Sequence, residues 1–270
     1  MPQPEGEALA RLYDLDLAQD PGDVDLYLAL AARTDRPVIE LAVGTGRVAV
    51  PLAAAGHTVT GIDRDDAMLA RARARAAAEG PEVAARLELV RRDLFALLPR
   101  GAGEFGLAIL ALNSILVLGG RRAQRDAMDV LAGLLAPGGI AVVDAWQPLG
   151  EDLGRYDGRL SLEWLRRDPD TGRDVTKLAA AWFDAASRAI TLTTIFEEGA
   201  PGGPAARWTR VDAMHLVSGE ELRADAEDAG LEVEVVAGDY DLSPLGPGAD
   251  RAILVARKPA AVATEQAAGA

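Results

Sequence analysis

The first half of the chain alternates short apolar runs with segments of helical periodicity. Apolar runs bounded by glycine, proline or charged residues are typical of buried strands, and they occupy residues 38–43, 57–62, 87–90, 105–112 and 140–146. Apolar side chains recur at helical spacing in residues 48–55, 65–74 and 126–135, between those runs. This alternation predicts a parallel α/β sheet with helices on both faces. Two further helices are expected before it, over residues 7–17 and 23–31, with Asp23 as the N-cap of the second.

The second half begins with a different pattern. Residues 160–216 contain segments rich in β-branched and aromatic side chains, separated by turn signals such as Asp168–Gly172 and Asp184–Ser187. This predicts an antiparallel sheet inserted after the fifth strand, with residues 199–204 as a hairpin loop. An N-cap signature at Ser218 then opens a helix, and two strands at residues 231–236 and 251–257 should pair antiparallel. Residues 259–270 are rich in alanine without an apolar stripe and are expected to be disordered.

The first strand–turn–helix unit carries the clearest chemistry. Gly44 and Gly46 can adopt positive φ and expose the backbone, so that a ligand can approach closely. Asp63 follows the second strand, where a carboxylate can accept both hydroxyls of a ribose. A nucleoside is therefore the predicted ligand.

A dinucleotide fits this unit less well than a cationic nucleoside. The third glycine of the dinucleotide fingerprint is missing, although Ala49 does not by itself exclude that ligand. Glu40 lies inside the apolar strand, four residues before Gly44, and would repel a pyrophosphate. A positively charged ligand would not be repelled.

These motifs resemble those of the class I S-adenosylmethionine-dependent methyltransferases. The resemblance rests on the acid, three residues and Gly-x-Gly of residues 40–47, on Gly61-Ile62-Asp63, on Asp93-Leu94 after the third strand, and on the Leu-x-Pro-Gly-Gly turn at residues 135–139. The alternative is a glycine-rich turn in some other α/β protein. The resemblance implies a doubly wound, seven-stranded, mostly parallel Rossmann-like sheet, with the antiparallel sheet inserted after strand five.

The resemblance also implies a division of the chain and a cofactor, S-adenosyl-L-methionine. Residues 1–35 would form a helical lid, residues 36–150 and 216–258 the cofactor-binding core, residues 151–215 the substrate-side sheet, and residues 259–270 the tail. The residues expected to bind the cofactor are Tyr27, Glu40, Ala42, Gly44, Gly46, Arg47, Asp63, Arg64, Met68, Asp93, Leu94 and Asn113.

Individual roles follow from the same resemblance. Asp93 would accept a hydrogen bond from the exocyclic amine of adenine, and the N–H of Leu94 would meet a ring nitrogen. Arg64 and Met68 would pack near the adenine. Tyr13 and Tyr27 would cover the sulfonium. For the tyrosines and Met68 the alternative is an ordinary core position, and for Asp93 it is a solvated loop acid.

The residues that bind the methyl acceptor are indicated less specifically by the sequence than those that bind the cofactor. We expect Tyr13, Ser114, Trp146, Arg210 and His215 to bind the acceptor, and Trp182 to shape the same pocket. Methyl transfer from a sulfonium is an in-line displacement that depends mainly on orientation, and a base is needed only for a protonated nucleophile. His215 is the first candidate base and Tyr13 the second. The alternative for His215 is a hydrogen-bonded histidine at the end of a strand.

Composition narrows the remaining possibilities. The 270 residues include 28 Lys and Arg against 42 Asp and Glu, a formal net charge of −14 that disfavours nucleic acid. There is no cysteine, which excludes disulfides and thiolate catalysis, and only two histidines, so no metal site is expected. No apolar run is long enough to span a membrane, and a cytoplasmic location is expected. The expected partners are a small-molecule methyl acceptor and a second copy of the chain in a homodimer.

The predicted function is therefore methylation of nitrogen or oxygen on a small molecule. Two alternatives stay open. One is an enzyme of the same fold that uses the sulfonium for other chemistry, such as cyclisation. The other is a non-enzymatic regulatory module, in which the three acids Glu40, Asp63 and Asp93 would have no purpose.

Overall fold

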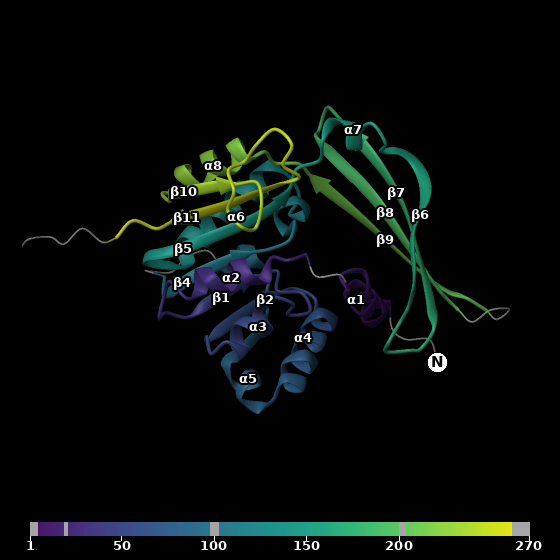
Figure 1. Cartoon of the computed structure of the whole chain (residues 1–270), viewed down its shortest axis with the longest axis horizontal. Helices are drawn as coiled ribbons and strands as arrows, with labels where there is room; N and C mark the ends of the chain where they lie inside the picture. The colour runs from purple at the N-terminus through teal and green to yellow at the C-terminus, as the bar shows by residue number, and fades with distance from the viewer. Residues whose placement is uncertain (1–4, 19–20, 98–102, 200–203, 261–270) are drawn as a thin grey trace, which may run out of the picture.

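The computed structural model describes residues 5–18, 21–97, 103–199 and 204–260, and it contains two separate sheets (Figure 1). Sheet A has seven strands in the order β10-β11-β5-β4-β1-β2-β3. Its strands are β1 (Val38–Leu41), β2 (Val59–Asp63), β3 (Leu87–Arg91), β4 (Phe105–Leu110), β5 (Leu135–Trp146), β10 (Glu232–Ala237) and β11 (Arg251–Arg257). The first five are parallel, whereas β11 runs antiparallel to both β5 and β10.

Helices cover both faces of sheet A, which confirms the predicted doubly wound fold. One face packs against α6 (Arg121–Leu134) and α8 (Gly219–Asp228) around a core that includes Leu131 and Leu222. The other packs against α2 (Val24–Ala31), α3 (Ala49–Ala54), α4 (Asp66–Glu79) and α5 (Pro81–Arg86). The central strands are buried on both faces because they are apolar throughout, as in β4.

Sheet B is the inserted antiparallel sheet that the alternating segments predict. It follows the short helix α7 (Gly150–Leu153) and consists of β6 (Asp157–Arg167), β7 (Asp174–Asp184), β8 (Ala189–Gly199) and β9 (Ala206–His215), in that spatial order. Figure 1 shows it standing beside sheet A, with helix α1 (Glu5–Asp16) in the space between them. We call the face toward α1 the inner face.

The two faces of sheet B differ in burial. Leu12 and Leu15 of α1 pack on the inner face against Val175 and Phe196. The outer face leaves large apolar side chains exposed, namely Leu160, Leu162, Leu165, Trp182 and Val211. Trp182 was expected to shape the acceptor pocket, and this expectation is wrong: its side chain is 58% exposed on the outer face. The alternation along β7 places Trp182 opposite to Ala181.

Charged groups attach α1 to sheet B and to α4. Arg11 forms ion pairs with Asp168 and Glu198, and all three side chains are at most 4% exposed. Asp16 pairs with Lys177 and also accepts a hydrogen bond from the indole of Trp164. On the opposite side of α1, Asp14 pairs with Arg71 and Arg75 of α4.

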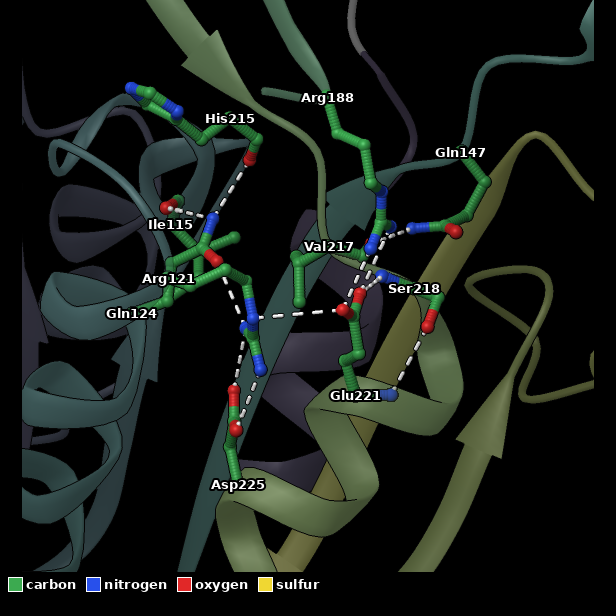
Figure 2. A network of polar contacts seen from close by, with 10 residues as sticks. All are labelled: Ile115, Arg121, Gln124, Gln147, Arg188, His215, Val217, Ser218, Glu221 and Asp225. Carbon is green, nitrogen blue, oxygen red and sulfur yellow. Dashed lines mark hydrogen bonds and ion pairs between the residues drawn. The ribbon is translucent and has the colours of Figure 1, made fainter. Parts of the chain in front are cut away.

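A second polar network joins the end of sheet B to α6 and α8, the helices that cover one face of sheet A (Figure 2). Gln124 of α6 is fully buried, and its amide donates hydrogen bonds to the carbonyl oxygens of His215 (2.8 Å) and Ile115 (3.3 Å). Arg121 donates to Gln124 and forms a bidentate pair with Asp225 of α8. We call this set, together with the pair between Arg188 and Glu221, the joint network.

Other local predictions differ in their outcome. Ser218 caps α8 and Asp65 caps α4, as their residue types predict. Asp23 is the N-cap residue of α2, as predicted, but its side chain makes no capping hydrogen bond, because Arg47 contacts both of its carboxylate oxygens. In the predicted hairpin loop, residues 200–203 lie outside the described residues, as do residues 261–270 of the predicted tail. Within the described ranges, none of the helices has the length and apolar character needed to cross a membrane.

Candidate cofactor and acceptor site

A cleft of about 470 Å³ lies where the strands of sheet A end, between these strand ends, α1 and β9. Ten of the residues that the sequence singles out line it: Tyr13, Ala42, Gly44, Asp63, Arg64, Met68, Asp93, Leu94, Ser114 and Arg210. Parallel strands bring their carboxyl ends to one edge, so residues far apart in the chain meet there. The cleft is therefore the candidate site.

The loop after β1 forms the floor of this cleft. Ala42, Gly44 and Gly46 all have positive φ, at 54°, 54° and 76°. A Cβ on Gly46 would lie 3.1 Å from the side chains of Ala72 and Val50, so glycine lets α4 pack closely there. Gly46 therefore shapes the loop from beneath, whereas Gly44 faces the cleft.

Asp63 braces this loop from the end of β2. One carboxylate oxygen accepts a hydrogen bond from the N–H of Gly44 (2.8 Å) and the other from the N–H of Asp65 (2.9 Å). Each oxygen keeps a lone pair, because a carboxylate offers about four acceptor sites. Asp63 can thus hold the loop and still accept ligand hydroxyls.

Two buried acids lie below the cleft. The Glu40 side chain is 4% exposed, and its Oε2 has no hydrogen-bond partner among the described residues. Burial raises the pKa of Glu40 to about 8, against the lowering effect of nearby Arg47. Asp23, by contrast, is paired with Arg47 at 2.5 and 2.7 Å. Glu40 is therefore a buried acid whose charge a cationic ligand would stabilise.

The two tyrosines occupy different positions. Tyr13 lines the cleft, and burial raises the pKa of its hydroxyl, with Arg47 acting in the opposite direction. Such a hydroxyl keeps its proton at neutral pH and acts as a donor. Tyr27 is fully buried on α2 and does not line the cleft, and its hydroxyl lacks a partner among the described residues.

Asn113 and Trp146 lie behind the cleft. Asn113 has a positive φ of 65°, and its Oδ1 accepts a hydrogen bond from the N–H of Trp146 at 2.7 Å. Neither residue lines the cleft, and the ring of Trp146 instead lies 6.2 Å from that of Tyr156. Asn113 thus connects the ends of β4 and β5 and places Ser114, its neighbour, at the cleft.

His215 lies at the end of β9 and does not line the cleft. Its ring packs beside Gly120, where a Cβ would come within 3.7 Å of Nδ1. Its backbone carbonyl belongs to the joint network (Figure 2). The role of His215 as a general base remains a prediction.

Several residues that line the cleft were not predicted from the sequence. Gly6, Leu9 and Ala10 contribute from α1, and Asp212 contributes from β9, where it pairs with Arg210 at 2.7 Å. A signal for Asp212 was available, because it stands two residues from Arg210 in an alternating strand. The positions on α1 give no such signal, since they are ordinary helix residues.

Comparison with known proteins agrees with this geometry. Residues 38–139 match the family model described as a methyltransferase domain. An uncharacterized protein of Mycobacterium tuberculosis is 42% identical over 119 residues, which is 44% of this chain. The match spans 39% of the length of that curated relative.

Two solved structures resemble nearly the whole chain. The CcbJ methyltransferase from Streptomyces caelestis is 28% identical with a TM-score of 0.74, over 89% of this chain and 97% of that one. CalS10 from Micromonospora echinaspora, an amino pentose methyltransferase solved with bound S-adenosylmethionine, is 22% identical with a TM-score of 0.67, over 92% of this chain and 96% of that one. The fold is that of a Rossmann-like α/β protein with a cleft at its strand ends. Residues 38–139 match a methyltransferase domain, and nearly the whole chain is similar to solved S-adenosylmethionine-dependent methyltransferases.

Proposed function

We propose that the protein transfers the methyl group of S-adenosyl-L-methionine to a nitrogen or oxygen atom of a small molecule. The observation that carries this proposal is the buried Glu40 carboxyl, whose Oε2 lacks a hydrogen-bond partner among the described residues, beneath a cleft lined by Asp63 and Asp93. The cleft lining holds four acids, Asp63, Asp65, Asp93 and Asp212, against three arginines, Arg64, Arg92 and Arg210. Glu40 adds a buried acid beneath it, and this surplus of acids suits a ligand with net positive charge. The likeness to CcbJ and CalS10 supports the same activity.

The residues of the cleft fit this cofactor. Glu40, beside the pair of Asp23 and Arg47, would hold the charged amino-acid end, and Asp63 would accept from the ribose hydroxyls. Arg64, Met68, Asp93 and Leu94 would surround the adenine. When bound, the cofactor supplies an activated methyl group, and the protein needs to orient the acceptor and exclude water.

On the acceptor side, we propose that Tyr13, Ser114, Arg210 and Asp212 contact the reacting group. The Tyr13 hydroxyl would donate a hydrogen bond, and the Asp212 carboxylate would pair with an ammonium group or take its proton. In the corresponding division of the chain, residues 1–35 cover the cofactor and residues 151–215 form the acceptor side of the core.

A screen of acceptors tests this function. Amine, carboxylate and phenol libraries would be incubated with the cofactor, and release of S-adenosylhomocysteine would be measured. We expect turnover with one class, lost in Asp63→Ala. Binding of the cofactor with no turnover of any acceptor would argue against methyl transfer. In the same assay, Asp212→Asn should reduce the rate more than His215→Ala, and the opposite order would restore His215 as the base.

We also propose that the protein acts in the cytoplasm and forms a homodimer. The exposed leucines on the outer face of sheet B support a self-association surface. Analytical ultracentrifugation should show a dimer that Leu162→Asp converts to a monomer. An unchanged mass for that variant would reject this surface.

A further inference from the structure

A second cavity, of about 640 Å³, opens on the inner face of sheet B. Its floor is made by the inner-face side chains of β7, β8 and β9, and residues 154–157 together with Arg159, Ser161 and Glu163 of β6 complete its lining. This volume lies within the range of about 300–1,000 Å³ that is common for small-molecule sites. We call it the inner chamber.

The floor of the inner chamber is apolar and shallow. Ala179 and Ala181 of β7 stand beside Ile190 and Leu192 of β8, with Met214 of β9 next to them. The same face packs tightly against α1 farther along, where Val175 and Phe196 meet Leu12 and Leu15. Two alanines therefore leave room above the sheet at the position where α1 no longer covers it.

The floor of the inner chamber offers no cation to a phosphate. Lys177 of β7 is only 16% exposed and is paired with Asp16 at 2.7 Å, whereas Arg155 and Arg159 are mostly exposed to solvent. A phosphate or pyrophosphate on the floor needs cations that are free to make charge-assisted hydrogen bonds. The floor thus favours a ligand body without phosphate groups.

The inner chamber adjoins the cleft along β9. Arg210, Asp212 and Met214 alternate with outward-facing residues, so all three lie on the inner face. Arg210 and Asp212 line the cleft, whereas Met214 lines the inner chamber. A ligand that follows β9 would reach from one cavity into the other.

We propose that the inner chamber binds the non-reacting body of the methyl acceptor, an apolar group without phosphate, while its nucleophile extends along β9 to Asp212. This rests on the proposed function, because the cleft must hold the methyl donor. The acceptor is then an elongated molecule of drug-like size, and the inner-face alanines determine which acceptors fit.

Two substitutions on neighbouring residues of β7 test this. Ala181→Trp would fill the inner chamber, whereas Ala180→Trp places the same side chain on the outer face. The probe is dansylcadaverine, which joins an apolar ring system to a primary amine, and its affinity would be measured by fluorescence anisotropy. We expect at least tenfold weaker binding to Ala181→Trp and a change below twofold for Ala180→Trp.

The remaining measurements separate the two proposals. If wild-type protein does not bind S-adenosylhomocysteine in calorimetry, the proposed function fails. If wild-type protein binds S-adenosylhomocysteine, two results would overturn only the proposal for the inner chamber. One is equal affinity of the probe for both variants, and the other is no binding of the probe to wild type. Binding of methylanthraniloyl-labelled ADP that Ala181→Trp abolishes would overturn the phosphate-free ligand class. If Ala181→Trp does not fold, Ala179→Phe on the same face replaces it, with the same expected loss.

Discussion

The strand ends of sheet A and the inner face of sheet B both contain buried polar groups, but they use them differently. Below the cleft, Glu40 Oε2, the Tyr27 hydroxyl and Thr45 Oγ1 lack hydrogen-bond partners among the described residues. On sheet B, Arg11 pairs with Asp168 and Glu198, and Lys177 with Asp16. Unpartnered buried groups are costly, so they persist where a ligand completes them. Paired groups, by contrast, attach one element to another.

The largest expected effect comes from breaking the pairs on sheet B. Arg11→Met leaves two buried carboxylates without their cation, which costs about 3–5 kcal/mol in comparable buried networks. Urea denaturation should therefore show a lower free energy of unfolding by that amount. Arg33→Met is the matched control, since Arg33 and Glu234 form an exposed pair whose loss should cost less than about 1 kcal/mol. Equal losses of unfolding free energy in the two variants would contradict the conclusion that the buried pairs of sheet B stabilise the fold.

Removing an acid that faces the ligand should weaken cofactor binding. The loss in binding free energy should be somewhat smaller than the loss in stability expected for Arg11→Met. Asp63→Ala removes the brace on Gly44 and the acceptor for ribose, and we expect cofactor affinity to fall by about 2–4 kcal/mol. Calorimetry with S-adenosylhomocysteine measures this. Asp66→Ala is the control, because Asp66 is exposed and forms an ion pair with Arg91, which is also exposed. Unchanged affinity in Asp63→Ala would reject the ribose assignment.

Breaking the joint network should have an effect of intermediate size on stability. Gln124→Leu leaves the carbonyls of Ile115 and His215 without their buried donor, at a cost of about 1–3 kcal/mol. Thermal unfolding should show this loss, and hydrogen exchange should increase at residues 113–118 and 213–217. Arg122→Ala on the exposed side of α6 should change neither measurement. A stable Gln124→Leu protein with normal exchange would show that the joint network does not hold sheet B.

The smallest effect concerns the protonation of Glu40. With a pKa of about 8, Glu40 carries a proton in the ligand-free protein at neutral pH. A cation beside it favours the carboxylate, so cofactor binding should release this proton. Affinity should therefore rise with pH up to about 8, by at most about 1.4 kcal/mol per pH unit, and level off above that. Calorimetry in two buffers of different ionisation enthalpy measures the number of protons released on binding. Glu40→Gln should show neither the proton release nor the rise of affinity with pH.

Much of sheet A was predictable, because its strands are apolar throughout and their order follows from repeated β-α-β units. The cleft residues on loops after these strands were predictable for the same reason. The N-cap position of Asp23 was predictable, but the pairing of its side chain was not, because Arg47 is 24 residues away and local capping rules do not include such contacts. Alternation in β7 separates Trp182 from Ala181 but does not say which face α1 will cover. The placement of His215 beside Gly120 likewise depends on tertiary packing.

Helix α1 has a consequence for any attempt to exchange acceptor specificity between relatives. It lines the cofactor cleft, yet Arg11 and Asp16 fasten it to sheet B, more than 140 residues later in the chain. A chimaera that grafted only residues 151–215 would separate each of these charges from its partner. The transferable unit is discontinuous: residues 5–16 must be included in the graft, so that the proposed cover of the cofactor and the proposed floor of the acceptor site are inherited together.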